Sequence, residues 1–208
     1  MKKDFNIVLA GVGGQGILLA AEVLGTAAVK DGLNVRVGEI HGMAQRGGAV
    51  LCTVRIGENV FSPMILEGQA DILLGFEPLE TLRNVKYASE KTLIIMGDER
   101  IPPPGLTLKG ESYPRIEEIL ERLKLFSKNI ITIDASRLAK EAGSTVMQNA
   151  VLLGALTAGK LPIKKESLIE ALKELVPAKY VEMNVKAFEL GYNYVKSLEK
   201  SKTCVKPY

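Results

Sequence analysis

The distribution of apolar residues predicts alternating strands and helices over the first two thirds of the chain and helices alone thereafter. Apolar runs predict strands at 5–10, 34–40, 49–56, 60–62, 71–76, 92–96 and 129–134. Helical spacing predicts helices over 15–30, 78–86, 113–124, 135–142, 146–158, 166–176 and 178–198. We therefore expect an α/β fold in three layers, with a mixed β-sheet and a helical C-terminal third.

Two of these helices have apolar patterns that indicate where they pack. The helix over 15–30 is apolar almost all round, which is typical of a helix buried on several sides. The last helix carries one apolar seam, expected to pack on the core of its own domain and formed by Val181, Val185, Phe188, Tyr192 and Val195. Nothing in the composition marks a boundary, so residues 1–208 are predicted to form a single domain.

Two glycine-rich loops follow predicted strands. The first is Gly11-Val-Gly-Gly-Gln-Gly16, and the second is His41-Gly-Met-Ala-Gln-Arg-Gly-Gly48. The first loop opens a helix, so its backbone amides and the positive end of the helix dipole favour an anion. The second loop leads into another strand instead. We expect the first loop to be the better candidate for holding a phosphate.

Dinucleotide binding is the obvious alternative for the first loop. Gly11, Gly13 and Gly16 fit G-x-G-x-x-G, and Glu39 closes the next strand where a ribose-binding carboxylate would stand. That fold needs a crossover helix between its second and third strands, and a parallel connection takes about a dozen residues. Only residues 41–48 separate those strands here. The spacing therefore disfavours NAD or FAD.

Composition narrows the chemistry. The net charge of +3 is too mild to indicate nucleic-acid binding, and no run could span a membrane. Cys52 and Cys204 show no metal or cluster spacing, and such sparse cysteine usage suits a reducing cytoplasm. His41 is the only histidine, so neither a histidine-based triad nor a multi-histidine metal site can form within the chain. No catalytic residue is identified, no metal site is expected, and 47% hydrophobic residues suggest a surface covered by a partner.

Taken together, the two loops resemble the gamma-type domain of the 2-oxoacid:ferredoxin oxidoreductases, and the second loop is most similar to that of the indolepyruvate branch. The resemblance extends over essentially the whole chain and includes Asn149 followed by Leu153-Gly154. It implies a heteromeric complex of anaerobic metabolism. That complex would decarboxylate an arylpyruvate of the indolepyruvate type, transfer the acyl group to coenzyme A as a substrate, and reduce ferredoxin.

The resemblance also implies thiamine diphosphate, a divalent metal and iron–sulfur clusters. Gly97-Asp98-Glu99 lacks the second glycine of a thiamine motif, and Asn129 stands alone after it. Two cysteines cannot supply the four thiolates of a cluster. We therefore expect these cofactors on a larger alpha subunit, none of them bound by this chain alone, and the chain to be inactive without that subunit.

The sequence allows more than one role for each loop. The amides of Gly13, Gly14, Gln15 and Gly16 are candidates for a coenzyme A phosphate, or the loop only satisfies a tight turn and contacts the partner. In the second loop His41, Gln45, Arg46, Gly47 and Gly48 are candidates for an interface or active-site-facing segment, because the guanidinium of Arg46 suits a carboxylate or phosphate. The alternative is a stand-alone nucleotide- or coenzyme A-binding protein.

Overall fold

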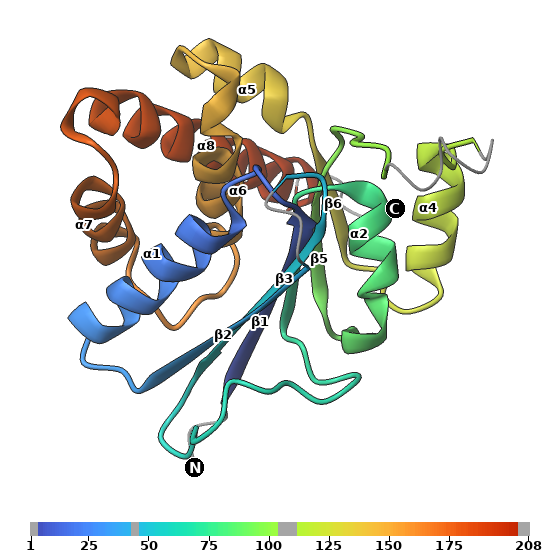
Figure 1. Ribbon diagram of the computed structural model, residues 1–208, viewed down its shortest axis with the longest axis horizontal. Helices are drawn as coiled ribbons and strands as arrows, with labels where there is room; N and C mark the ends of the chain where they lie inside the picture. The colour runs from blue at the N-terminus through green and yellow to red at the C-terminus, as the bar shows by residue number, and fades with distance from the viewer. Residues whose placement is uncertain (1–3, 43–45, 104–111, 204–208) are drawn as a thin grey trace.

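A computed structural model describes residues 4–42, 46–103 and 112–203, and these contain one six-stranded mixed sheet (Figure 1). The strand order is β2-β3-β1-β4-β5-β6. β3 is antiparallel to both of its neighbours, whereas β1, β4, β5 and β6 are mutually parallel. The strands are β1 (Phe5–Val12), β2 (Val35–His41), β3 (Ala49–Ile56), β4 (Ile72–Gly75), β5 (Leu93–Gly97) and β6 (Ile130–Ile133).

Helices cover both faces of the sheet, so the expected three-layer α/β architecture is confirmed. One face carries α1 (Ile17–Lys30), α6 (Gln148–Thr157), α7 (Lys165–Leu175) and α8 (Val181–Thr203), with α5 (Ala135–Ala142) packed on α6 and α8. The opposite face carries α2 (Pro78–Arg83) and α4 (Ile116–Lys124). Short 3-10 turns stand at Val85–Tyr87, Thr145–Met147 and Ala178–Tyr180. The helical C-terminal third is likewise confirmed.

One predicted strand is absent. Residues 60–62 form no strand, which corrects the prediction from the apolar pattern. Arg55 Nη1 donates to the carbonyl oxygens of Ser62 at 3.0 Å and Met64 at 3.1 Å, in place of ladder bonds. Pro63 has no N–H and packs on Gly38, where a Cβ would stand 2.8 Å from the proline ring. The segment therefore crosses the face of the sheet as a covering loop.

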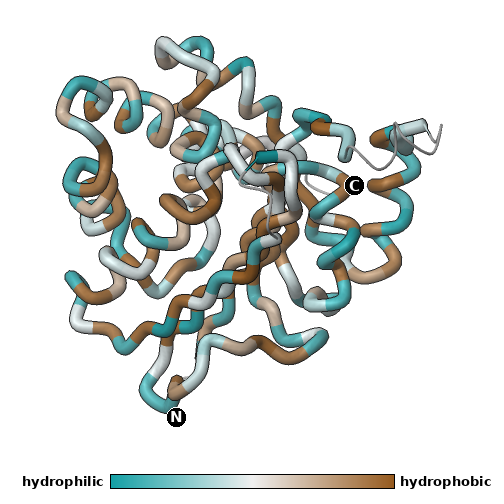
Figure 2. Tube along the Cα trace, in the orientation of Figure 1, coloured by the Kyte–Doolittle hydropathy of each residue, from teal (hydrophilic) through white to brown (hydrophobic). Residues whose placement is uncertain are grey.

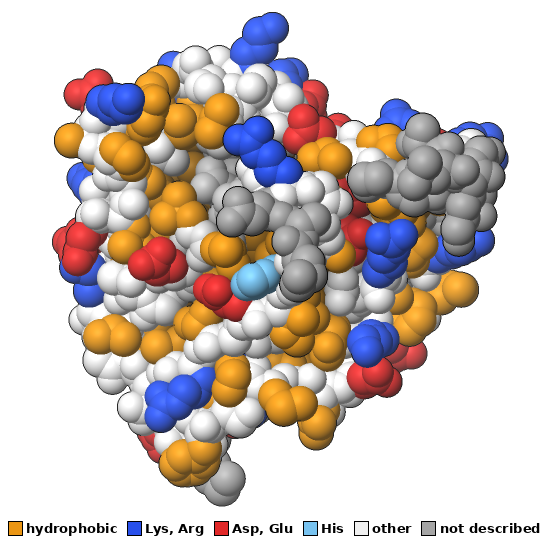
Figure 3. All heavy atoms as spheres, viewed as in Figure 1, with side chains coloured by type: hydrophobic (Ala, Val, Ile, Leu, Met, Phe, Trp, Pro, Cys, Tyr) orange, Lys and Arg blue, Asp and Glu red, His pale blue; other side chains and the backbone are white. Residues whose placement is uncertain are grey.

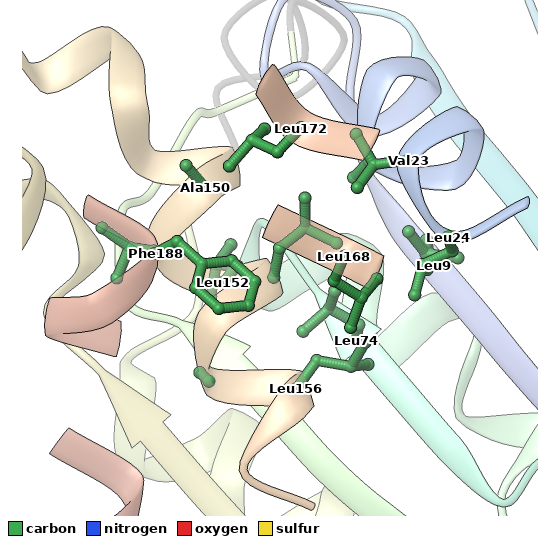
Figure 4. Close-up of a cluster of buried hydrophobic side chains, with 14 of the residues drawn as sticks. Leu9, Val23, Leu24, Leu74, Ala150, Leu152, Leu156, Leu168, Leu172 and Phe188 are labelled. Atoms are coloured by element: carbon green, nitrogen blue, oxygen red, sulfur yellow. The ribbon is translucent and has the colours of Figure 1, made fainter. Parts of the chain in front are cut away.

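The larger core lies between the sheet and the helices of the first face (Figure 4). Leu9 and Leu74 from the sheet meet Val23, Leu168 and Leu152 from three helices. The hydropathy colouring of Figure 2 shows hydrophobic residues concentrated on the central strands and on the inward sides of the helices. Within the described ranges, no helix is both long and apolar enough to cross a membrane.

The C-terminal helices pack through glycines. A Cβ on Gly154 of α6 would stand 1.8 Å from the carbonyl oxygen of Phe188, and one on Gly191 of α8 would stand 1.9 Å from that of Val151. Phe188 and Val195 of the predicted seam are buried, whereas Val181, Val185 and Tyr192 are only partly so. The expected packing on the chain's own core therefore holds, with the closest approach made by backbone against backbone.

Only part of the apolar surface of α1 is buried. Its residues Ile17, Ala20, Val23, Leu24 and Ala27 are buried. Leu18 is 43% exposed and Val29 is 64% exposed. An apolar stripe of this helix therefore faces outward.

Cys52 lies fully buried on β3, and burial raises the pKa of its thiol to about 12. At pH 8 such a thiol is ionised to only about one part in ten thousand, and the thiolate is the reactive form. We expect Cys52 to resist iodoacetamide in the folded chain and to react in denaturant. Peptide-mapped mass spectrometry separates it from Cys204, and rapid labelling of the native Cys52 peptide contradicts the prediction.

Candidate functional site

The two glycine loops meet at the end of the sheet where the parallel strands have their carboxyl ends. The strands β1, β2, β4 and β5 end here, and the antiparallel strand β3 begins here. After β1 the chain builds one side of the sheet with β2 and β3, and from β4 it builds the other side with β5 and β6, so the strand order reverses beside the first loop. In open α/β sheets, ligands bind beside strand ends at such switch points. Topology therefore places both loops in the favoured position.

Backbone hydrogen bonds join the loops directly. Gly13 N donates to Gly48 O at 2.8 Å, and Gly47 N donates to Gly13 O at 3.3 Å. These bonds extend the β1–β3 ladder beyond the Val12–Ala49 pair. Gly47 has a φ of 76°, a backbone conformation that residues other than glycine rarely adopt. The position of the second loop is thus set by the first.

Gln15 ties the first loop to β4. Its Oε1 accepts from Val12 N at 2.9 Å, and its Nε2 donates to Phe76 O at 3.0 Å. A Cβ on Gly11 would stand 2.7 Å from the same Oε1, so only glycine fits beneath the amide. The side-chain amide of Gln15 therefore links the first loop to the end of β4.

Replacing Gln15 by alanine is expected to lower the free energy of unfolding by about 1–3 kcal/mol, because it leaves a partly buried amide and carbonyl unpaired. Gln15→Glu keeps the acceptor for Val12 N but sets an oxygen against Phe76 O, so it should not restore stability. Urea unfolding of the isolated chain measures both variants. Wild-type stability in Gln15→Ala would show that the tie contributes nothing.

The amides available to an anion are fewer than the sequence suggests. Gly13 N bonds Gly48 O, and Gln15 N bonds Val12 O at 3.1 Å. Within the described residues, the amides of Gly14 and Gly16 have no such partner, and the first turn of α1 leaves further N–H groups free. Gly14 and Gly16 have φ of 105° and 75°, and a Cβ on Gly16 would stand 2.6 Å from Asn149 Nδ2. Asn149 therefore braces the loop from α6.

Hollows flank the first loop on two sides. A groove of about 960 Å³ runs between the first loop, the start of α1 and the end of β2, and is lined by Val12, Gly13, Gly14, Gly16, Ile17, Leu18, Leu19, His41, Gly42 and Val50. A smaller hollow of about 340 Å³ lies on the other side, with Glu99 and Gln148 in its wall. Gln148 Nε2 donates to Glu99 Oε2 at 2.8 Å there. The larger groove brings both loops onto one surface.

The described polar side chains of the second loop are exposed to solvent. His41 and Arg46 are exposed, and His41 Nδ1 lies 3.3 Å from Gly42 O. Gly47 and Gly48 are half-buried against the first loop. Gln45 lies outside the described residues. His41 and Arg46 are therefore accessible to a second molecule from this end of the sheet.

Buried carboxylates at the end of β4 went unnoticed in the sequence. Glu77 caps α2 by accepting from Glu80 N at 2.8 Å, and it also accepts from Ile101 N at 3.3 Å and from the Tyr113 hydroxyl. Burial raises the pKa of the Glu80 carboxyl and that of the Tyr113 hydroxyl. The hydrogen bond to Glu77 raises the pKa of Tyr113 further. The signal available was an acidic residue directly before Pro78 at a helix start. This network holds Ile101 beside the smaller hollow.

The residues present do not fit thiamine diphosphate or its metal. Asp98 follows β5, where its amide donates to Ile133 O at the end of β6. Asn129 precedes β6 at the opposite end of the sheet, and its Nδ2 donates to Glu90 O at 3.4 Å. The two side chains therefore cannot share a cation. In the part of the chain that the structure describes, no group of three or more His, Cys, Asp or Glu could hold a metal ion.

Comparison with known proteins gives a consistent result. The family model for pyruvate ferredoxin/flavodoxin oxidoreductases matches residues 6–194. The chain is 44% identical over 198 residues to the indolepyruvate oxidoreductase subunit IorB of Pyrococcus horikoshii, covering 94% of this chain and 98% of that one.

Solved structures share the fold. The gamma subunit of a keto/oxoacid ferredoxin oxidoreductase from Geobacter sulfurreducens has a TM-score of 0.67 at 24% identity, covering 93% of this chain and 99% of that one. A 2-oxoglutarate:ferredoxin oxidoreductase from Magnetococcus marinus, solved with 2-oxoglutarate, coenzyme A and succinyl-CoA bound, has a TM-score of 0.70 at 22% identity. There the match covers 95% of this chain and 32% of the longer one.

The chain therefore belongs to the pyruvate ferredoxin/flavodoxin oxidoreductase family. Within that family it is a small subunit of a multi-subunit 2-oxoacid:ferredoxin oxidoreductase, which confirms the resemblance seen in the two loops.

Proposed function

We propose that this chain is the small subunit of an oxidoreductase that converts arylpyruvates of the indolepyruvate type to aryl-acetyl-CoA and passes the electrons to ferredoxin. The observation that carries the proposal is the 44% identity to an indolepyruvate oxidoreductase subunit over 94% of the chain. The relatives named for pyruvate or 2-oxoglutarate, at 26–30% identity, are more distant. A stand-alone binding protein is set aside because the chain is a subunit of a complex.

The larger alpha subunit supplies the chemistry in this proposal. Thiamine diphosphate, its divalent metal and the iron–sulfur clusters belong on that subunit, since Asp98 and Asn129 lie at opposite ends of the sheet and Cys52 is buried. Residues 1–208 act as one gamma-type domain that completes the complex, which we place in the cytoplasm on the basis of cysteine usage.

In this proposal the chain contributes the surface formed by its two glycine loops. The amides of Gly14 and Gly16, which have no hydrogen-bond partner among the described residues, and the 960 Å³ groove beside them support a contact with a phosphate of coenzyme A. Gly13 and Gln15 shape that surface through the hydrogen bonds described above, and Gly11 leaves room for the Gln15 side chain. His41, Gln45, Arg46, Gly47 and Gly48 form the segment that faces the larger subunit or its active site.

Anaerobic reconstitution tests the proposed reaction. The chain is mixed with the co-expressed larger subunit, and ferredoxin reduction is followed with indolepyruvate and coenzyme A. We expect turnover only when both subunits and coenzyme A are present. Turnover that prefers pyruvate or 2-oxoglutarate would overturn the arylpyruvate assignment. Equal turnover without this chain would overturn its role in the complex.

A further inference from the structure

An apolar trough runs along the outer strand of the sheet, and two of its carboxylates have no ion-pair partner among the described residues. It lies between α1 and β2, has a volume of about 870 Å³, and is lined by Leu18, Glu22, Gly25, Thr26, Val29, Lys30, Val35, Val37, Glu39 and Glu174. Residues 18, 22, 25 and 29 form one stripe of α1, because helical positions three and four apart share a face. From Leu18 to Val29 the stripe extends about 17 Å. Figure 3 shows this face, with hydrophobic side chains gathered over α1 and acidic ones among them.

The trough lies beside further exposed apolar side chains on both faces of β2. The described residues include eleven large hydrophobic side chains with substantial exposure, and seven belong to α1, β2 or the loop over 57–71 that packs on β2. Leu18, Val29 and Val37, which line the trough, are 43%, 64% and 37% exposed. β2 is also the outermost strand, so one edge of its backbone has no neighbouring strand. An apolar surface beside an open strand edge is typical of a protein interface.

The charges in the trough indicate what covers it. Glu22 and Glu39 are exposed and take part in no ion pair within the described ranges, whereas Glu174 pairs with Lys30 at 2.9 Å. A second copy of this chain, docked through the same surface, would set these carboxylates against each other. A partner with lysine or arginine beside an apolar ridge would instead complement both features. The charge pattern therefore favours a different polypeptide over self-association.

We propose that the trough is the docking surface for a segment of the larger subunit that carries an apolar ridge flanked by lysine or arginine. The trough shares Leu18 with the groove that contains His41, so one interface runs from the glycine loops along α1 and β2. This inference rests on the proposed function for the identity of the partner. It adds the location of the contact and the chemistry of the segment that fills it.

Binding measurements on single variants test the proposal. Val29→Lys and Val37→Lys should each weaken the Kd for the larger subunit by about tenfold or more, since a buried lysine disrupts the apolar contact and repels a basic segment. Val29→Glu should weaken it less, because its charge suits that segment. Glu22→Gln and Glu39→Gln should reduce the salt dependence of binding. Leu125→Lys, at an 82% exposed leucine after α4, is the matched control and should stay within about twofold of wild type.

The outcomes separate the two proposals. If the wild type assembles and turns over but Val29→Lys and Val37→Lys bind within twofold of it, the trough is not the interface and the proposed function stands. If the wild type does not bind the larger subunit, the proposed function fails and this inference with it. If the isolated wild type sediments as a dimer that Val29→Lys makes monomeric, a second copy is the occupant and the proposal is wrong.

Discussion

Replacing Arg46 by alanine is expected to reduce turnover of the assembled complex by about 30-fold to 5,000-fold while the isolated chain unfolds as before. Arg46 is exposed, so its loss should change the free energy of unfolding by about 0.5 kcal/mol or less. If it pairs with a carboxylate or an anionic ligand at the interface, its removal leaves that group unpaired in a desolvated site. Such a loss costs about 2–5 kcal/mol, which corresponds to the range of rates given.

Two further variants define the role of Arg46. Arg46→Lys should recover only part of the turnover, because an ammonium cannot reproduce the planar fork of the guanidinium. Arg122→Ala, at an exposed arginine on α4, should leave turnover unchanged. The measurements are thermal unfolding of the subunit and steady-state turnover of the reconstituted complex. Full turnover in Arg46→Ala with normal assembly would reduce this arginine to a solvated loop charge.

The largest effect on stability is expected for Gly154→Ala. The added methyl group would stand 1.8 Å from the carbonyl oxygen of Phe188, so α6 and α8 must separate. Overpacking of this kind typically costs about 1–3 kcal/mol, and a clash with backbone falls at or above the upper end. In a chain of this length, about 3 kcal/mol corresponds to a fall in Tm of about 6–12 °C.

Gly25→Ala is the matched control, because Gly25 also lies within a helix. Its added methyl group would meet only the end of the Val37 side chain at 3.0 Å, and Val37 is partly exposed and can shift. Alanine also favours the helix by up to about 1 kcal/mol over glycine. We therefore expect unchanged or raised stability for Gly25→Ala. An equal fall in Tm for both variants would show that the close contact between α6 and α8 is not the cause.

The local elements were predictable because they depend on periodicity within one segment. The apolar runs located all six strands, and the short connection over 41–48 correctly required a mixed sheet. Where a long-range contact competes with local pattern, prediction failed. Residues 60–62 were predicted to form a strand, but Arg55 of β3 donates to the carbonyl oxygens of Ser62 and Met64 instead. The helix α1, expected to be buried on several sides, has eight buried residues, but it covers the outermost strand and keeps one apolar stripe exposed.

The sequence by itself determined the family, the α/β class and the position of the glycine loops at strand ends. Only the tertiary structure decided which groups in those loops are free. Gly13 N and the Gln15 side chain have partners more than thirty residues away, at Gly48 and Phe76, brought beside them by the order of strands in the sheet. The burial of Glu77 with Tyr113 and the open edge at β2 likewise follow from strand order. The physical reason is that spacing along the chain encodes backbone conformation, whereas hydrogen-bond partners and exposure depend on which distant segments the sheet places side by side.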